Sequence, residues 1–174
     1  MEFIIYIIAC FLQPICWPLP EMTTIFYGAK LFGDLNAFII GYIAILFGII
    51  FMYKISFYLS EHYLKKIKSG KKFQKFQNYI EKNEILTCGI LFILPILPDE
   101  IICIGSAIIG IKFKIFIIIA IIAKFISIGG VAFSGTIADK FNVTSINVVL
   151  IELLIIFIAS LLYRVYKERK NNIN

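Results

Sequence analysis

The amino-acid sequence predicts an all-α polytopic membrane protein made of two inverted repeats and a C-terminal transmembrane helix. Each repeat is expected to be a re-entrant helical hairpin followed by one transmembrane helix. Three observations predict this fold. The chain is 60% hydrophobic and only 16% charged, whereas a soluble domain is about a quarter charged. It contains long uncharged runs. Two of its apolar stretches are broken by prolines in the same pattern.

The length of 174 residues suits one membrane domain with no attached soluble module. We expect this domain to cover residues 1–166, followed by a basic tail at 167–174. The net charge of +6 is interpreted as a signal of membrane orientation. No basic stripe carries a stacking platform or a recognition motif, so we expect no nucleic-acid partner.

The N-terminal region predicts the first hairpin, over residues 2–33. Residues 2–13 are apolar but too short to span a bilayer, which takes about 20 residues. They meet a break that runs from Pro14 to Pro20, and a second short apolar piece follows. One kinked spanning helix over residues 3–31 is the alternative. Glu2 and the lack of a small-residue cleavage site argue against a removed signal peptide.

The first transmembrane helix is expected at residues 36–60. A lysine-rich segment follows at 61–83. Its apolar residues fall at helical spacing, which favours an amphipathic helix on an anionic membrane surface, and a solvated loop is the alternative. The second hairpin is expected at 84–111, the second transmembrane helix at 113–138, a polar turn at 139–145 and the last transmembrane helix at 146–166.

The two predicted hairpins share the same pattern of prolines, acids and glycines. Each has a proline pair followed directly by an acid, then two glycines: Pro18, Pro20, Glu21, Gly28 and Gly33 in the first, and Pro95, Pro98, Asp99, Glu100, Gly105 and Gly110 in the second. Proline breaks a helix, and the glycines are expected to allow close packing. Broken segments in corresponding positions of two halves are typical of a transporter's binding site.

Lysines and arginines predict the orientation, because they concentrate in short cytoplasmic loops. The 61–83 loop and the C-terminus are therefore expected in the cytoplasm and the N-terminus outside. The hairpins then open from opposite faces and their tips meet near the midplane.

Four charged residues form the candidate binding site: Glu21, Asp99, Glu100 and Lys124. A lysine in the middle of a transmembrane helix costs ~2.5–3.5 kcal/mol on insertion scales, so Lys124 is expected to find an acid. Asp99 or Glu100 is the first choice of partner, and Glu21 the other. Such a cluster can bind an anionic head group or relay protons. Alternatively, the acids cap the half-helices, whose N-termini favour negative charge.

Enzyme and metal motifs are absent from the sequence. It has no HExxH, GxSxG, P-loop or Cys/His metal spacing, and one histidine. Its four cysteines are scattered through apolar sequence and are interpreted as small hydrophobes. We therefore expect neither an enzyme nor a cofactor or metal.

The chain resembles the VTT-domain membrane proteins, the superfamily of the DedA and SNARE-associated Golgi proteins. The resemblance covers roughly residues 10–140. It is carried by Leu12-Gln13 leading to Pro18-Leu19-Pro20-Glu21, by Gly28, Phe32-Gly33, Gly41 and Gly48, and in the second half by Phe92, Pro95-Ile96-Leu97-Pro98-Asp99-Glu100, Gly105, Gly110-Ile111 and Phe113 to Phe116.

The resemblance implies two facing re-entrant hairpins and a role in moving lipids across the bilayer. Members are linked to lipid scrambling and to recycling of polyprenyl-phosphate carriers, in bacteria often coupled to protons. Glu21 and Asp99 match the family's acidic positions. Phe92 stands where an arginine is common, and Lys124 where a second arginine is common.

The expected function is therefore lipid translocation between the leaflets of the cell membrane, with membrane lipids as partners and protons as a candidate coupling ion. The lipid is expected to be anionic or a phospholipid. A proton- or ion-coupled carrier of small solutes and a non-transporting membrane scaffold are the alternatives. A homo-oligomer also stays open.

Overall fold

The structure is a computed structural model that describes residues 1–15, 20–63, 88–89, 92, 99–142, 144–151, 154 and 158. Every regular element in these residues is helical, as the sequence predicts. The helices are α1 (Glu2–Leu12), α2 (Glu21–Phe32), α3 (Asp34–Tyr63), α7 (Asp99–Ile109) and α8 (Phe113–Phe141).

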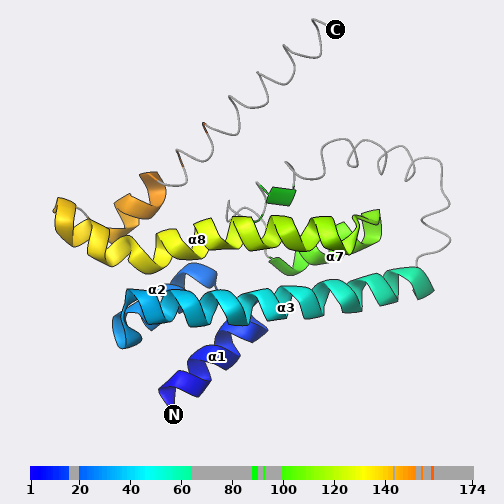
Figure 1. Ribbon diagram of the computed structural model, residues 1–174, viewed down its shortest axis with the longest axis horizontal. Coiled ribbons are helices and arrows are strands. Elements are labelled where there is room, and N and C mark those ends of the chain that lie inside the picture. Colours follow the sequence, from blue (N-terminus) through cyan, green and yellow to red (C-terminus); the bar gives the residue numbers. More distant parts are fainter. Residues whose placement is uncertain are drawn as a thin grey trace, which may run out of the picture.

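The two long helices, α3 and α8, lie side by side and antiparallel (Figure 1). The phenol of Tyr42 on α3 donates a hydrogen bond of 2.9 Å to the carbonyl of Ile121 on α8. Near the start of α3, the Thr136 hydroxyl donates to Asp34. The segments Asp34–Ser60 and Phe113–Phe141 are long and apolar enough to cross a membrane. They match the expected transmembrane helices at 36–60 and 113–138.

Both long helices expose large apolar side chains to their surroundings. The exposed set includes Phe47, Phe51, Ile118, Ile122 and Phe125. Soluble proteins rarely leave apolar surface of this extent uncovered, so these faces suit contact with lipid chains.

The end of α8 corrects one prediction. A polar turn is expected from residue 139, but the helix continues to Phe141. Asn142 then ends it in the left-handed conformation, at φ 53°, and its N–H donates to the carbonyl of Ala138. Asparagine is one of the few residues that adopt this conformation readily, so the helix stops there and not at the first charged residue.

The short helices α1 and α2 fold back on each other. The ring of Phe32, at the end of α2, lies 5.7 Å from that of Phe3 and 5.6 Å from that of Tyr6, both on α1 (centroid distances). Between the helices, Pro20 has an extended backbone and precedes the first turn of α2. The alternative of one kinked helix over residues 3–31 is therefore wrong.

In the second predicted hairpin, the structure describes α7 and little of what precedes it. Helix α7 begins at Asp99, and both Asp99 and Glu100 lie in its first turn. Pro95 and Pro98 lie outside the described residues, as do Pro18, the 64–83 part of the lysine-rich loop and the 167–174 tail. Of the last expected transmembrane helix, residues 146–151 are described and helical.

Each short helix is separated from the long helix after it by a glycine with positive φ. Helix α2 has 12 residues, and Gly33 at φ 81° joins it to the 30 residues of α3. Helix α7 has 11 residues, and Gly110 at φ 90° precedes the 29 residues of α8. A side chain is strained in this conformation, so glycine sets both boundaries.

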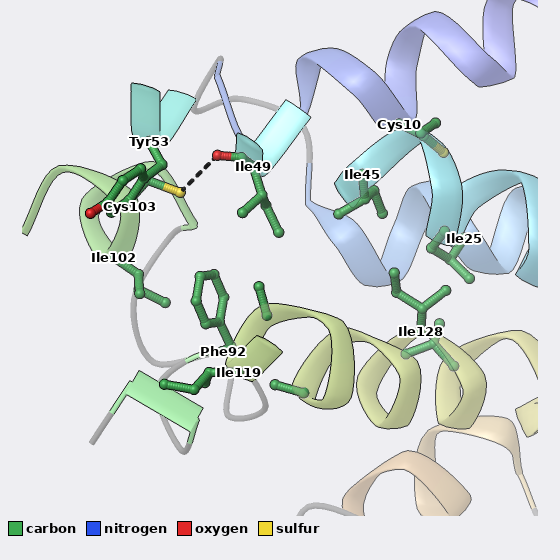
Figure 2. Close-up of a cluster of buried hydrophobic side chains, with 14 of the residues drawn as sticks. Cys10, Ile25, Ile45, Ile49, Tyr53, Phe92, Ile102, Cys103, Ile119 and Ile128 are labelled. Carbon is green, nitrogen blue, oxygen red and sulfur yellow. Dashed lines mark hydrogen bonds between the residues drawn. The ribbon is translucent and has the colours of Figure 1, made fainter. Parts of the chain in front are cut away.

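The core lies where the short helices pack on the long ones. Helix α3 contacts α1, α2, α7 and α8, and α2 also contacts α8. Ile25 of α2, Ile45 and Ile49 of α3, and Ile128 of α8 are fully buried, and Figure 2 shows their side chains gathered between these helices. Thus α2 packs against the long helix of the second half, and α7 packs against that of the first.

The glycines divide into different roles. A Cβ at Gly28 would lie 2.4 Å from the ring of Tyr6, and one at Gly48 would lie 2.3 Å from the backbone oxygen of Phe11. Close packing is therefore present at both positions. At Gly105 a Cβ would meet no atom of the described residues within 4 Å, so the close packing predicted there is not seen among them. A Cβ at Gly33 would also meet none of them, and the glycine at this position is explained by its backbone conformation.

Candidate functional site

Lys124, near the middle of α8, joins three helices through its ammonium group. Its Nζ forms an ion pair with Glu21 in the first turn of α2. It forms a second ion pair with Asp99 in the first turn of α7, at 2.7 Å from Oδ2. The lysine side chain is only 3% exposed. The prediction that Lys124 finds an acid is confirmed, and it finds two.

Glu21 has two further partners. The hydroxyl of Ser127 donates a hydrogen bond of 2.9 Å to Oε1 of Glu21. The amide nitrogen of Gln13 donates to Oε2 at 3.5 Å. Ser127 follows Lys124 by three residues, so both side chains lie on the same face of α8. Helix α8 thus holds the first carboxylate of α2 at two points.

Glu100 does not share this arrangement. It is 9% exposed, and its Oε1 has no hydrogen-bond partner among the residues that the structure describes. The ion pairs that the structure gives Lys124 are with Glu21 and Asp99. The expectation that Glu100 pairs with Lys124 is therefore not met. Its charge is nevertheless close enough to interact with Asp99, its neighbour in the first turn of α7.

An aromatic ring borders the cluster. The Lys124 ammonium lies 5.7 Å from the centroid of the Phe92 ring, within the range of a cation–π interaction. The family resemblance leads us to expect an arginine at this position. In this chain an apolar ring lies beside the ammonium instead.

The acids also lie where the helix dipole favours them. Glu21, Asp99 and Glu100 all fall in the first turn of a helix, where backbone N–H groups carry partial positive charge. The predicted alternative, that the acids serve as helix-end charges, therefore holds together with the ion-pair role. Carboxylates placed in this way can bind a cation or exchange a proton.

Sequence analysis did not place Gln13 or Ser127 in the site. Ser127 has a usable signal, since it follows the central lysine by one helical turn. Gln13 is one of the residues that carry the family resemblance, but its approach to Glu21 depends on how α1 folds back on α2, which its position in the sequence does not show. Within the described residues, no group of three His, Cys, Asp or Glu side chains is arranged to hold a metal ion.

A separate apolar groove lies between α3 and α7. Its volume is about 340 Å³, and its lining residues are Met52, Ile55, Ser56, Leu59, Ser60, Ile104 and Ile108. Ile104 and Ile108 follow Asp99 along α7 by five and nine residues, which is about 7 to 14 Å by helical rise. The groove therefore lies on the helix that carries the second acid of the cluster.

The family model for the VTT domain matches residues 19–137 of the chain, a range that contains Glu21, Asp99, Glu100 and Lys124. The family resemblance predicted from the sequence is confirmed. No curated protein and no solved structure matches the chain.

Proposed function

The chain belongs to the VTT-domain family, that of the DedA and SNARE-associated Golgi proteins, and from this membership we propose that it translocates lipids between the leaflets of a membrane. The membership and the two apolar long helices indicate a membrane protein. Lipid translocation, the identity of the lipid and any coupling to protons are parts of the proposal.

One observation carries the proposal: a buried ion-pair cluster lies where the two halves of the chain meet. Charges in the apolar part of a membrane protein are costly and commonly mark a substrate or ion pathway. Lys124 connects α8 to Glu21 of the first half and to Asp99 of the second. A polar head group that crosses between leaflets needs polar groups in the apolar interior to replace its lost hydration.

The shape around the cluster supports a lipid substrate. The side chains of Glu21 and Asp99 are 15% and 10% exposed, whereas that of Lys124 is 3% exposed. Both acids thus retain a small exposed surface, which the lysine lacks. The apolar groove between α3 and α7 lies along the same helix as Asp99. An apolar groove of this kind suits an acyl chain.

We further propose that the two halves form an inverted repeat of re-entrant hairpins. The short helix, the positive-φ glycine and the long helix occur in the same order in both halves. The reciprocal packing of α2 on α8 and of α7 on α3 suits two hairpins that enter from opposite faces. The acids at the start of α2 and α7 would then meet at mid-depth.

In this mechanism Lys124 alternates between its two carboxylate partners. A head group that enters from one face competes for Glu21 or Asp99, and the lysine shifts its pairing to the other acid. The exchange keeps the ammonium compensated throughout, which matters because an unpaired buried charge is strongly destabilising. A proton on one carboxylate can accompany the head group.

Translocation in proteoliposomes tests the proposal. Vesicles carry the full chain and phospholipids labelled on an acyl chain, and an impermeant reductant bleaches the outer leaflet. We expect bleaching of inner-leaflet label with the native chain, slowed at least about tenfold in Glu21→Gln and Asp99→Asn, since each loses a charged partner of Lys124. Glu2→Gln is the matched control, because Glu2 is exposed at the start of α1.

The alternatives give different results. Native rates equal to empty liposomes for all lipids would reject lipid translocation. In that case, uptake of a polar solute would favour a solute carrier, and no transport of either kind would favour a scaffold.

A further inference from the structure

We propose that the later part of α3 and the start of α8 form a binding surface for an anionic phospholipid. This lysine surface consists of Lys54 on α3, Lys112 directly before α8, Lys114 in its first turn, and the ring of Phe113. Lys114 precedes Lys124 by ten residues, about 15 Å by helical rise, so the lysine surface lies apart from the ion-pair cluster. A lipid bound there stays in its leaflet, and the proposal does not depend on lipid translocation.

Tyr53 holds the start of α8 against α3. Its ring stacks on that of Phe116, with centroids 4.3 Å apart, and lies 5.6 Å from that of Phe113. Its hydroxyl donates a hydrogen bond to the carbonyl of Ile111. The next residue of α3, Lys54, has its ammonium 5.6 Å from the centroid of the Phe113 ring, within the range of a cation–π interaction. The contacts therefore bring a cation of α3 to the first residue of α8.

The lysine surface carries three positive charges that its own acids do not balance. Lys54, Lys112 and Lys114 are all exposed. Among the residues that the structure describes, no carboxylate forms an ion pair with any of them. The first turn of α8 contains no acid. Cations grouped around one ring repel one another, and an anion that lies among them removes this repulsion. The surface is thus complementary in charge to a phosphate.

On α3, the lysine lies at the end of an exposed apolar stripe. Ile43, Phe47 and Phe51 precede Lys54 by eleven, seven and three residues, a spacing that places all four side chains on one face of the helix. The three apolar side chains are exposed. Acyl chains of lipids suit this stripe, and the ammonium at its end then lies at the level of the lipid head groups.

The start of α8 repeats this arrangement. Ile118, Ile121 and Phe125 follow Lys114 by four, seven and eleven residues, so they share its face of the helix, and all three are exposed. Basic residues beside apolar membrane segments attract anionic lipids. A soluble anion would leave both stripes without a partner. Choline and ethanolamine head groups carry a cation of their own, so a lipid with net negative charge is favoured.

Native mass spectrometry of the full chain in detergent micelles tests the proposal. The chain is titrated with phosphatidylglycerol and with phosphatidylcholine of identical acyl chains, and the bound lipid molecules are counted. We expect the native chain to bind phosphatidylglycerol at least about tenfold more tightly, because each cation near the head groups adds to the attraction. Equal affinities for the two lipids would overturn the proposal.

A double variant, Lys54→Gln with Lys114→Gln, locates the binding. It removes the charge at the end of each stripe, so we expect the affinity for phosphatidylglycerol to fall at least about tenfold and that for phosphatidylcholine to stay the same. The matched control is Lys30→Gln with Lys140→Gln. Both control lysines are exposed, in the last turns of α2 and α8, and Lys30 also lies over a ring, 4.5 Å from the centroid of Phe26.

The comparison of the two double variants decides whether the lysine surface is the site. An unchanged lipid preference in the first variant, or an equal loss of affinity in both, would contradict the assignment. Soluble glycerol 3-phosphate, added alone, tests the part that the apolar stripes play. We expect it to bind at least about tenfold more weakly than phosphatidylglycerol, and equal binding would reject a lipid as the ligand. Preference for phosphatidylglycerol without translocation would leave this proposal standing and reject the proposed function.

Discussion

Lys124 is the residue that connects the two halves of the molecule. It lies in the middle of a long apolar helix and is 3% exposed in its side chain, and its two ion pairs join α8 to α2 and α7. A buried ammonium with carboxylate partners is tolerated because each charge compensates the others. Removal of any one member leaves the rest without full compensation.

Replacement of Lys124 by methionine is expected to destabilise the fold. The side chain keeps its length, but Glu21 and Asp99 lose their cation, and breaking a buried pair costs about 3–5 kcal/mol. The free energy of unfolding, from denaturant titration in mixed micelles, measures the effect. Lys140→Met is the matched control, since Lys140 is exposed in the last turn of α8. Equal stability of the two variants would show that the ion pairs contribute nothing.

Two glycines of helix interiors are expected to respond oppositely to alanine. In Gly48→Ala the new Cβ would lie 2.3 Å from the backbone oxygen of Phe11, and such overpacking costs about 1–3 kcal/mol. In Gly105→Ala the Cβ meets no atom of the described residues within 4 Å, so the better helix propensity of alanine is expected to add about 0.5–1 kcal/mol of stability. Thermal unfolding of both variants checks the signs. Changes of the same sign would contradict the assigned packing.

The charged residues of the candidate site were predictable from the sequence, because a charged side chain in an apolar segment is energetically costly and therefore usually has a function. Which of the acids pair with Lys124 was not predictable. Sequence spacing does not decide among Glu21, Asp99 and Glu100, since the choice depends on how α2 and α7 approach α8. Gln13 entered the site for the same reason.

At the scale of the elements, the short and long helices are divided by backbone conformation. Gly33 and Gly110 both have positive φ, and each lies between a short helix and the long helix that follows. The sequence placed these boundaries well, because proline and glycine act locally. It misplaced the end of α8, where Asn142 acts as a helix-ending residue beyond the charged Asp139 and Lys140.

Alanine at Gly33 is expected to strain this boundary. Gly33 lies at φ 81° and ψ 154°, a region that glycine adopts readily and that costs a residue with a side chain about 1–3 kcal/mol. A Cβ there gains no contact within 4 Å among the described residues. The melting temperature of Gly33→Ala should fall below that of Gly135→Ala, a substitution within α8 that also meets open space. A melting temperature equal to that of the control would mean that the boundary relaxes without cost.

At the scale of the whole molecule, the antiparallel long helices fix which ends share a membrane face. Asp34 at the start of α3 is hydrogen-bonded to Thr136 near the end of α8. Tyr53, toward the other end of α3, donates to the carbonyl of Ile111, just before α8. If both helices span, positions 34 and 140 lie on one side and position 114 on the other.

Single cysteines test this topology. In a chain whose four native cysteines are replaced by alanine, an impermeant maleimide should label cysteines at 34 and 140 from the same side of a cell or vesicle. A cysteine at 114 should be labelled from the other side, which the lysine distribution predicts to be cytoplasmic. Labelling of 34 and 114 from one side would contradict the arrangement of two spanning helices.

We propose that Glu21, Lys124 and Asp99 act as one unit in lipid translocation, and a double-mutant cycle on the translocation rate tests this proposal. Initial rates in proteoliposomes are compared for the native chain, Glu21→Gln, Asp99→Asn and the double variant. Members of one unit are non-additive, so the double variant should be about as slow as the slower single variant. Native rates in the single variants, or effects that multiply in the double variant, would contradict the claim.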